Sequence, residues 1–311
     1  MKTVLPAFVR ALVEPKLPAA LDVTWVKTRD EAVAAMPNAD IGWVDLIPHG
    51  LTPEAVAAGH SLKWLFTAIA GVDSLDKAAL VRQGTIVTNG NGLIAPAVAD
   101  YAVMGVLVAA KRFDQVVRAQ DRREWPMVAP GNLELGGSSA LVVGMGAIGS
   151  AIADRLRAFG VDVTGVTRSG RDGTLTPDAW RSRLGEFDWV ILGAPSTGDT
   201  RAMIGADELA AMKPSAWLVN IARGDMIDQD ALVEALTKGT ISGAFLDPTE
   251  PEPLPADHPR WAAPNCIITM HLSGRSQTQM FRNAATLFLE NLDAFLAGRP
   301  LRNVVDLDAG Y

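Results

Sequence analysis

The chain has one cysteine, four histidines and no excess of basic residues. The single cysteine, Cys266, excludes an internal disulfide and gives no indication of an oxidising compartment. No CxxC or HExxH spacing occurs, so we predict no metal site. Lys and Arg number 28 against 35 Asp and Glu, and this net charge of −7 argues against a nucleic-acid partner. These absences favour a cytoplasmic protein.

Long apolar segments are also absent. The longest, residues 101–110, lies between Asp100 and Lys111 and is far shorter than the roughly 18 residues of a membrane-spanning helix. The N-terminal region is interrupted by Pro6 and Arg10 and has no small-residue cleavage site. We therefore predict a first strand, a chain that starts at Met1, and no contact with a membrane.

The chain instead shows a regular alternation of short apolar runs with helical patterns over 311 residues, about twice the ~150 residues of a typical domain. This alternation predicts an α/β fold with parallel sheets. The predicted strands form a first series at residues 2–9, 22–26, 40–44, 62–70 and 85–88, and a second at 140–143, 161–166, 189–192, 217–221, 241–246 and 266–269. The second series fits a doubly wound nucleotide-binding sheet.

Two long helical segments are predicted to connect the two series. Residues 95–118 form the first, and residues 277–296, with one apolar face interrupted by Asn291, form the second. We infer that the chain crosses twice between two domains with a cleft between them. The predicted domains are residues 1–98 plus 283–311 for the first, and residues 99–282 for the second.

A glycine-rich turn follows the first strand of the second series. Gly144, Gly146 and Gly149 stand directly after an apolar strand and at the start of a helix. The first glycine would permit a tight turn, the second the close approach of a pyrophosphate, and the third close packing of helix on strand. A turn without a ligand is the alternative, but the strand and helix on either side favour a dinucleotide site.

The end of the next strand bears on the choice of dinucleotide. NAD-selective sites carry an acidic residue about 20 positions further on, whereas this strand ends in Thr167, Arg168 and Ser169. Arg168 could meet a 2′-phosphate with a charge-assisted pair, and the two hydroxyls could donate hydrogen bonds. We predict NADP(H) in preference to NAD(H). The alternative is that Arg168 is a solvated loop residue.

Polar residues also follow later strands, at the edge where open α/β sheets bind ligands. Arg223 and His271 each follow a strand, and Glu250 and Glu252 lie in the Pro-rich segment between them. A histidine exchanges protons near neutrality, and an arginine and a carboxylate beside it would orient an anionic substrate for proton transfer at a carbonyl. Each residue also has a structural alternative. Arg223 could cap a strand-to-helix turn, Glu252 could be a solvated loop acid, and His271 could be a turn histidine whose hydrogen bonds are made within the protein.

Together these segments resemble the D-isomer-specific 2-hydroxyacid dehydrogenases over essentially the whole chain. The matching segments are AGVDSL at 70–75, VVGMGAIG at 142–149, MKPSAWLVNIARGDMIDQDALVEAL at 212–236, GAFLDPTEPEPLP at 243–255 and ITMHLSG at 268–274. Several motifs in order are a stronger signal than the glycine turn alone. The resemblance implies two doubly wound domains, a flavodoxin-like substrate domain and a Rossmann nucleotide-binding domain.

The resemblance also assigns roles to residues. It implies that Arg223, Glu252 and His271 are catalytic, with Glu252 chosen over Glu250 because the family's acid directly precedes Pro-Leu-Pro. It implies that backbone amides of Gly71 and Val72 hold the substrate carboxylate. The predicted substrate site is Ala70, Gly71, Val72, Arg223 and His271. The predicted cofactor site is Gly144, Gly146, Ala147, Ile148, Gly149, Thr167, Arg168, Ser169, Ala194, Pro195, Thr200, Ile221, Ala222, Arg223, Asp247, His271, Ser273 and Gly274.

The reaction implied is reduction of a small 2-keto acid, such as glyoxylate or hydroxypyruvate, to the D-2-hydroxy acid. Arg223 would bind the carboxylate and polarise the keto oxygen, His271 would donate the proton, and Glu252 would orient His271 and keep it protonated near neutral pH. Formate dehydrogenase relatives carry glutamine in place of the acid, so Glu252 argues against that branch. The alternative, from another class, is a non-enzymatic dinucleotide sensor on the same scaffold.

The resemblance further implies a homodimer formed through the connecting helix. The segment that matches this contact contains Phe113, Trp125, Pro126 and Met127, which are too apolar to be left in water. Because no serine-binding domain follows residue 311, we do not expect a regulated phosphoglycerate dehydrogenase.

Overall fold

The computed structural model describes residues 1–46, 50–275 and 279–307 and divides into two compact units. Unit 1 comprises Met1–Ile94 and Ser276–Tyr311, and unit 2 comprises Ala95–Arg275. Both passages between units lie slightly earlier than the expected positions after residues 98 and 282. Residues 47–49, 276–278 and 308–311, which include the start of the second predicted connecting helix, lie outside the described residues.

The sheet of unit 1 is parallel and has the strand order β2-β1-β3-β6-β7. In chain order this is the 2-1-3-4-5 arrangement of flavodoxin-type sheets, as predicted. A short antiparallel ribbon of β4 and β5 was not predicted. The strands are β1 (Lys2–Pro6), β2 (Asp22–Val26), β3 (Ile41–Trp43), β4 (Asp45–Leu46), β5 (Gly50–Leu51), β6 (Trp64–Phe66) and β7 (Ile86–Thr88).

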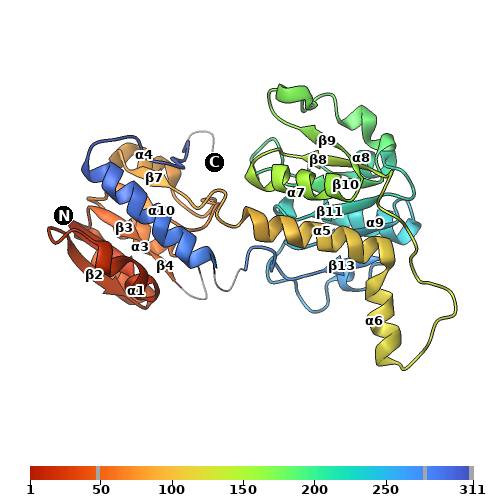
Figure 1. Ribbon diagram of the computed structural model, residues 1–311, viewed down its shortest axis with the longest axis horizontal. Helices are drawn as coiled ribbons and strands as arrows, with labels where there is room; N and C mark the ends of the chain where they lie inside the picture. Colours follow the sequence, from red (N-terminus) through yellow and green to blue (C-terminus); the bar gives the residue numbers. More distant parts are fainter. Residues whose placement is uncertain (47–49, 276–278, 308–311) are drawn as a thin grey trace. The chain divides into compact units, whose positions relative to one another are not determined.

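Helices cover both faces of this sheet (Figure 1). One face packs Leu65 against α2, α3 and α4, and the other packs Trp64 and Phe66 against α1 and α10, because successive strand side chains point to opposite faces. Asn291, the polar interruption of α10, is buried and exchanges two hydrogen bonds with the backbone of Arg302. The helices are α1 (Arg10–Val13), α2 (Arg29–Ala35), α3 (Pro53–Ala58), α4 (Lys77–Gln83) and α10 (Gln279–Leu296).

The sheet of unit 2 is also parallel, with the order β13-β12-β11-β10-β8-β9. A parallel bridge pairs Val166 of β9 with Leu175, at the position of one more edge strand. Counted in chain order from that edge, the strands then follow the 3-2-1-4-5-6 order of nucleotide-binding sheets, with β13 as a seventh. All six predicted strands form: β8 (Ser139–Val143), β9 (Asp162–Val166), β10 (Trp189–Leu192), β11 (Trp217–Asn220), β12 (Gly243–Leu246) and β13 (Cys266–Ile268).

Helices again lie on both faces, with α5 and α7 on one side and α8 and α9 on the other (Figure 1). Gly105 of α5 lies against the Phe245 ring, where an added Cβ would come within 2.6 Å of the ring, so this glycine lets α5 approach β12. None of the described helices is both long enough and apolar enough to span a membrane. The helices are α5 (Ala95–Lys111), α6 (Phe113–Asp121), α7 (Ala147–Ala158), α8 (Ala206–Ala211) and α9 (Gln229–Lys238).

The single connecting helix predicted over residues 95–118 is wrong, because the helix breaks at Arg112. This residue has a left-handed φ of 47°, and its guanidinium pairs with Asp114 and lies over the Trp217 ring. The backbone of Gly131 packs directly against the break, and the Lys111 ammonium donates to the carbonyl of Leu133. These tertiary contacts redirect the chain into α6.

Candidate active site

The glycine-rich turn joins β8 to α7 and is tightly packed at two of its three glycines. Gly144 has a φ of +98°, and a Cβ there would lie 2.6 Å from Ala194. A Cβ on Gly149 would lie 1.9 Å from the carbonyl oxygen of Gly144. Neither position admits a side chain, whereas a Cβ on Gly146 would meet nothing within 4 Å. Gly146 therefore keeps open a space that protein atoms do not fill.

The start of α7 at this turn suits an anion. Gly146, which precedes the helix, provides no side-chain cap. The N–H groups of Ala147, Ile148 and Gly149 donate to no acceptor among the described residues. Unsatisfied N–H groups and the positive end of the helix dipole attract negative charge. The residues present therefore fit the pyrophosphate of a dinucleotide.

The end of β9 differs in one detail from the prediction. Thr174 donates to the carbonyl of Arg171, so in the 2.7 Å pair of Thr167 and Thr174 hydroxyls Thr167 is the donor. The Thr167 proton is thus used within the loop and is not directed to a ligand. Arg168 and Ser169 are exposed. The predicted contacts of Arg168 and Ser169 to a 2′-phosphate stay predictions.

The remaining cofactor-site predictions fall at the carboxyl ends of neighbouring strands of the same sheet. Ala194 and Pro195 follow β10, and the Thr200 hydroxyl donates to the carbonyl of Pro195 and accepts the N–H of Thr197. Ile221 and Ala222 follow β11 and are buried. The structure therefore brings these segments to the edge that carries the glycine turn.

Arg223 is held at this edge by a buried asparagine. Asn220, the last residue of β11, donates to the carbonyl of Arg223 at 2.7 Å and accepts the N–H of Ala222 at 3.0 Å. The next residue, Gly224, packs against the Thr249–Glu250 backbone so closely that a Cβ would lie 2.1 Å from the Thr249 carbonyl carbon. This close approach brings the Arg223 turn against the segment that contains Glu252.

Glu252 and His271 form a direct pair. Nδ1 of His271 lies 2.9 Å from Oε2 of Glu252, and the other carboxylate oxygen accepts the N–H of Thr249 at 2.9 Å. Both side chains remain accessible, with 44% of His271 and 40% of Glu252 exposed. Of the two acids the sequence offered, Glu252 is therefore the one hydrogen-bonded to the histidine.

Asp247, at the end of β12, anchors the segment that carries His271. Its fully buried carboxylate accepts the Thr269 hydroxyl at 2.8 Å and the N–H groups of Leu272 and Ser273 at 2.7 and 3.0 Å. Its carbonyl accepts the N–H of His271, whose φ is 55°. The Asp247 side chain is thus used inside the protein, so a cofactor contact by this residue would come from its backbone.

The predicted substrate residues Ala70, Gly71 and Val72 belong to unit 1 and follow β6. Their N–H groups donate to no acceptor within the described residues, which leaves three consecutive donors in one loop. Their role remains a prediction.

Sequence reasoning missed the supporting residues Asn220 and Thr249. A polar residue at the end of an otherwise apolar strand was the available signal for Asn220, while nothing local distinguished Thr249. In the described part of the chain no group of three or more His, Cys, Asp or Glu side chains is arranged to hold a metal ion.

Known proteins are similar to this chain in both sequence and fold. Residues 103–273 match the sequence profile described as "D-isomer specific 2-hydroxyacid dehydrogenase, NAD binding domain". A glycerate dehydrogenase from Methylorubrum extorquens is 32% identical over 297 residues, 91% of this chain and 90% of that protein. A glyoxylate reductase from Korarchaeum cryptofilum is 32% identical over 272 residues, 85% of this chain and 82% of that protein. The structure of an NADPH-dependent glyoxylate/hydroxypyruvate reductase from Sinorhizobium meliloti, in complex with NADP and malonate, superimposes with a TM-score of 0.81 at 28% identity and covers 99% of this chain and 97% of that chain.

Proposed function

Because the chain belongs to the D-isomer specific 2-hydroxyacid dehydrogenase family, we propose that it reduces a small 2-keto acid such as glyoxylate or hydroxypyruvate to the D-2-hydroxy acid with NADPH. Membership itself makes the chain an oxidoreductase that uses a nicotinamide dinucleotide. The observation that carries the proposal is the 2.9 Å pair of His271 and Glu252 at the sheet edge that also bears Arg223 and the glycine turn.

The bound cofactor would supply a hydride to C2 of the keto acid, and the glycine turn with the first N–H groups of α7 would hold its pyrophosphate. The role of Arg223 is to bind the substrate carboxylate and to polarise the keto oxygen through its guanidinium. The backbone N–H groups of Gly71 and Val72 would hold the same carboxylate. These interactions fix the orientation of the reacting carbonyl.

His271 is proposed to donate the proton to the keto oxygen. Because Nδ1 faces Glu252, the proton available to the substrate is the one on Nε2. When Nε2 gives up this proton, Nδ1 keeps its own because it donates to the carboxylate. Glu252 therefore fixes both the orientation and the tautomer of the ring, and the Thr249 N–H holds the carboxylate in place for that purpose.

The preference for NADPH rests on Arg168 and Ser169 at the end of β9. Both are exposed where NAD-selective sites carry an acid. A carboxylate there would repel a 2′-phosphate, whereas a guanidinium and a hydroxyl attract one. The similar structure of the NADPH-dependent reductase from Sinorhizobium meliloti, in complex with NADP, supports the proposed preference for NADPH.

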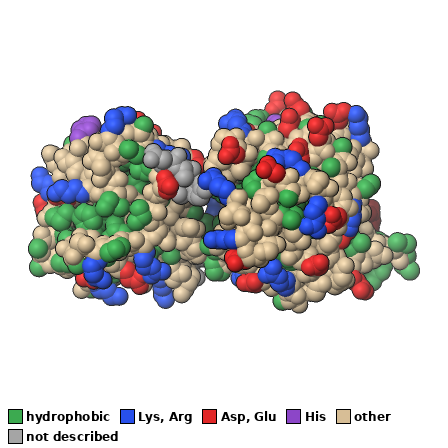
Figure 2. All heavy atoms as spheres, turned by 90° about the horizontal axis from the view of Figure 1, so that it is seen from above, with side chains coloured by type: hydrophobic (Ala, Val, Ile, Leu, Met, Phe, Trp, Pro, Cys, Tyr) green, Lys and Arg blue, Asp and Glu red, His purple; other side chains and the backbone are tan. Residues whose placement is uncertain are grey.

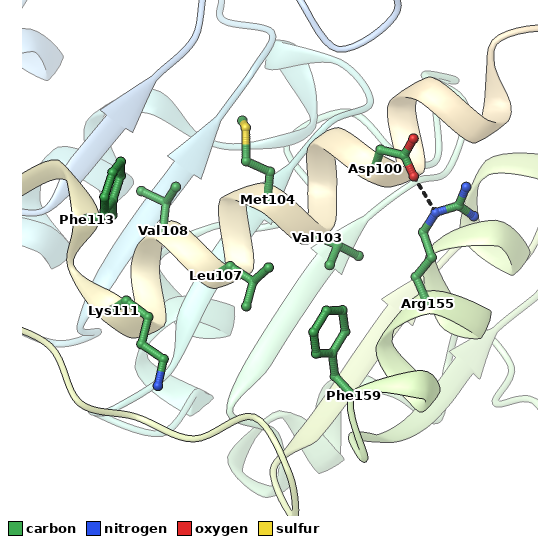
Figure 3. Close-up of a pocket in the computed structure, with 9 residues that line it drawn as sticks. All are labelled: Asp100, Val103, Met104, Leu107, Val108, Lys111, Phe113, Arg155 and Phe159. Atoms are coloured by element: carbon green, nitrogen blue, oxygen red, sulfur yellow. Dashed lines mark hydrogen bonds and ion pairs between the residues drawn. The ribbon is translucent and has the colours of Figure 1, made fainter.

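We also propose that the protein is a homodimer. An apolar groove of about 480 Å³ lies between α5 and the end of α7, with Asp100 and Arg155 paired at one end (Figure 3). The segment after α6 projects from unit 2 with hydrophobic side chains on its surface (Figure 2), and its Trp125 and Met127 are 89% and 91% exposed. Apolar surface of this kind on a groove and on a projecting segment suits a second copy of the chain.

The function is tested by mixing the purified protein with NADPH or NADH and each of glyoxylate, hydroxypyruvate and phenylpyruvate. We expect the two small keto acids to oxidise NADPH faster than phenylpyruvate does, faster than they oxidise NADH, and to yield the D-isomer wherever the product is chiral. Absence of cofactor oxidation with every acid would overturn the proposal. Faster oxidation of NADH would overturn the cofactor assignment alone.

A further inference from the structure

Unit 1 contains a buried carboxylate that the proposed mechanism does not use. Asp45 is 5% exposed, and burial raises the pKa of its carboxyl. Its two oxygens accept three hydrogen bonds, from Trp43 Nε1 at 2.8 Å, Thr67 Oγ1 at 2.8 Å and Ala68 N at 2.6 Å. Burying a carboxyl group costs free energy, so the presence of Asp45 at this position requires a structural or functional reason.

The hydrogen bonds of Asp45 lead into the loop formed by residues 67–72. Thr67 donates its hydroxyl proton to Asp45, so its oxygen is left to accept the N–H of Ile69 at 3.1 Å. Asp45 thus accepts the N–H of Ala68 directly. By accepting the Thr67 proton it also orients the hydroxyl oxygen that accepts the Ile69 N–H. The first two amides after Thr67 are satisfied within the protein.

The same loop is held from its other side by the segment that follows β7. The backbone N–H of Gly90 donates to the carbonyl of Ile69 at 3.1 Å, and the side-chain amide of Asn89 donates to the carbonyl of Ala70 at 2.7 Å. A Cβ on Gly90 would lie 1.9 Å from the Ala68 carbonyl oxygen, so the two backbones are in direct contact. The 67–72 loop is therefore fixed between Asp45 and the Asn89–Gly90 segment.

These contacts determine which amides stay available. In a trans peptide the C=O and the following N–H point in opposite directions. With the Ile69 and Ala70 carbonyls directed at Gly90 and Asn89, the N–H groups of Ala70 and Gly71 point away from that segment. Together with the N–H of Val72 they donate to no acceptor among the described residues. Three consecutive donors of this kind form a site for a carboxylate.

We propose that Asp45 is a positioning residue of the substrate site, which by binding Thr67 and Ala68 fixes the 67–72 loop so that the amides of Ala70, Gly71 and Val72 face the substrate carboxylate. This inference rests on the proposed function. A carboxylate suits the task because it accepts at both oxygens, whereas an asparagine would place an NH2 group against one of the three donors.

The test compares Asp45→Asn and Thr67→Val with Asp40→Asn. Thr67→Val keeps the shape of the side chain and removes only the hydroxyl that links Asp45 to Ile69. Asp40 is the matched control, because its carboxylate precedes β3 and pairs with Lys63 at 2.8 Å. In the protein without substrate, hydrogen exchange of the Ala68 and Ile69 amides, which are hydrogen-bonded to Asp45 and Thr67, is expected to accelerate in the first two variants, with β12 of unit 2 and the control unchanged.

Substrate binding gives the second readout. The KM for glyoxylate and the Kd for oxalate, a carboxylate that cannot accept the hydride, are expected to rise about tenfold in Asp45→Asn and Thr67→Val. The kcat should stay within about twofold, because the carboxylate is held equally in ground and transition states. The Kd for NADPH should not change.

Unchanged exchange in both variants would overturn the proposal, whatever the activity. Faster exchange with an unchanged KM and an unchanged oxalate Kd would also overturn it, since Asp45 would then support only the fold. If the unmodified protein neither reduces glyoxylate nor binds oxalate, the proposed function fails, and the exchange measurement still decides whether Asp45 orders the loop.

Discussion

A single methyl group at position 224 should separate the Arg223 turn from the Glu252 segment. A Cβ on Gly224 would lie 2.1 Å from the carbonyl carbon and 2.3 Å from the carbonyl oxygen of Thr249, whereas ordinary contacts begin at 3.4 Å. The obstructing atoms are backbone, so the two segments must move apart by more than about 1 Å. A displacement of about 1 Å in a catalytic arrangement costs roughly a hundredfold in rate.

Gly224→Ala is therefore expected to lower kcat for glyoxylate about a hundredfold. Overpacking of this size costs about 1 to 3 kcal/mol of stability, so the melting temperature should fall by several degrees. Gly136→Ala is the control, since its Cβ would meet only the Phe159 carbonyl oxygen at 3.7 Å. A folded Gly224→Ala protein with unchanged kcat would refute the link between this close approach and the geometry of the site.

Four further outcomes are expected. His271→Ala should lower kcat by roughly 10²- to 10⁴-fold in steady-state assays, and a loss below tenfold would place the proton donor elsewhere. Arg168→Ala should weaken NADPH binding by about 1.5 to 3 kcal/mol in titrations and leave NADH affinity unchanged. Equal losses of affinity for both cofactors would show that Arg168 only stabilises the loop. Light scattering should give about twice the 33.0 kDa of one chain, and Trp125→Asp should shift the mass towards one chain; a single-chain mass for the unmodified protein would contradict the dimer. Desolvation raises the pKa of the half-buried Cys266 thiol to about 12 against an ordinary 9.0. Near pH 8 the folded protein should therefore react with a thiol reagent roughly a thousandfold more slowly than the unfolded protein, and rapid labelling of the folded protein would contradict the raised pKa.

Fold class and parallel pairing were predictable because each strand is a short apolar run between turns and helical segments separate the runs. The two kinds of doubly wound domain were expected from the family resemblance. Strand ends were less predictable. The expected strand at residues 2–9 stops at Pro6, and the apolar residues beyond it, such as Val9, pack beneath α10 from a helical turn. Apolar character alone does not distinguish these two kinds of buried segment.

The residues of the candidate site came from two kinds of signal. Arg223 and His271 were proposed because they follow strands at the edge where α/β sheets bind ligands, and Glu252 because the family resemblance places its acid directly before Pro-Leu-Pro. Their catalytic roles stay predictions. Asp45 was not found, because in the sequence a buried acid looks the same as a solvated one. Its three donors come together only when β3 and β6 pair in the sheet, and that information is not local.

Unit 2 supplies all three side chains proposed to move or stabilise charge, and the His271–Glu252 bond is made within it. Unit 1 supplies the amides proposed to recognise the acid. The proposed proton donor therefore lies within unit 2, whereas the proposed contacts to the substrate carboxylate come from both units, from Arg223 and from these amides. Recombination that replaced Met1–Ile94 and Ser276–Tyr311 would exchange the recognition loop and leave the proton donor, its partner and the glycine turn intact. If the proposed roles hold, such an exchange would alter the amide contacts to the substrate without altering the proposed proton donor.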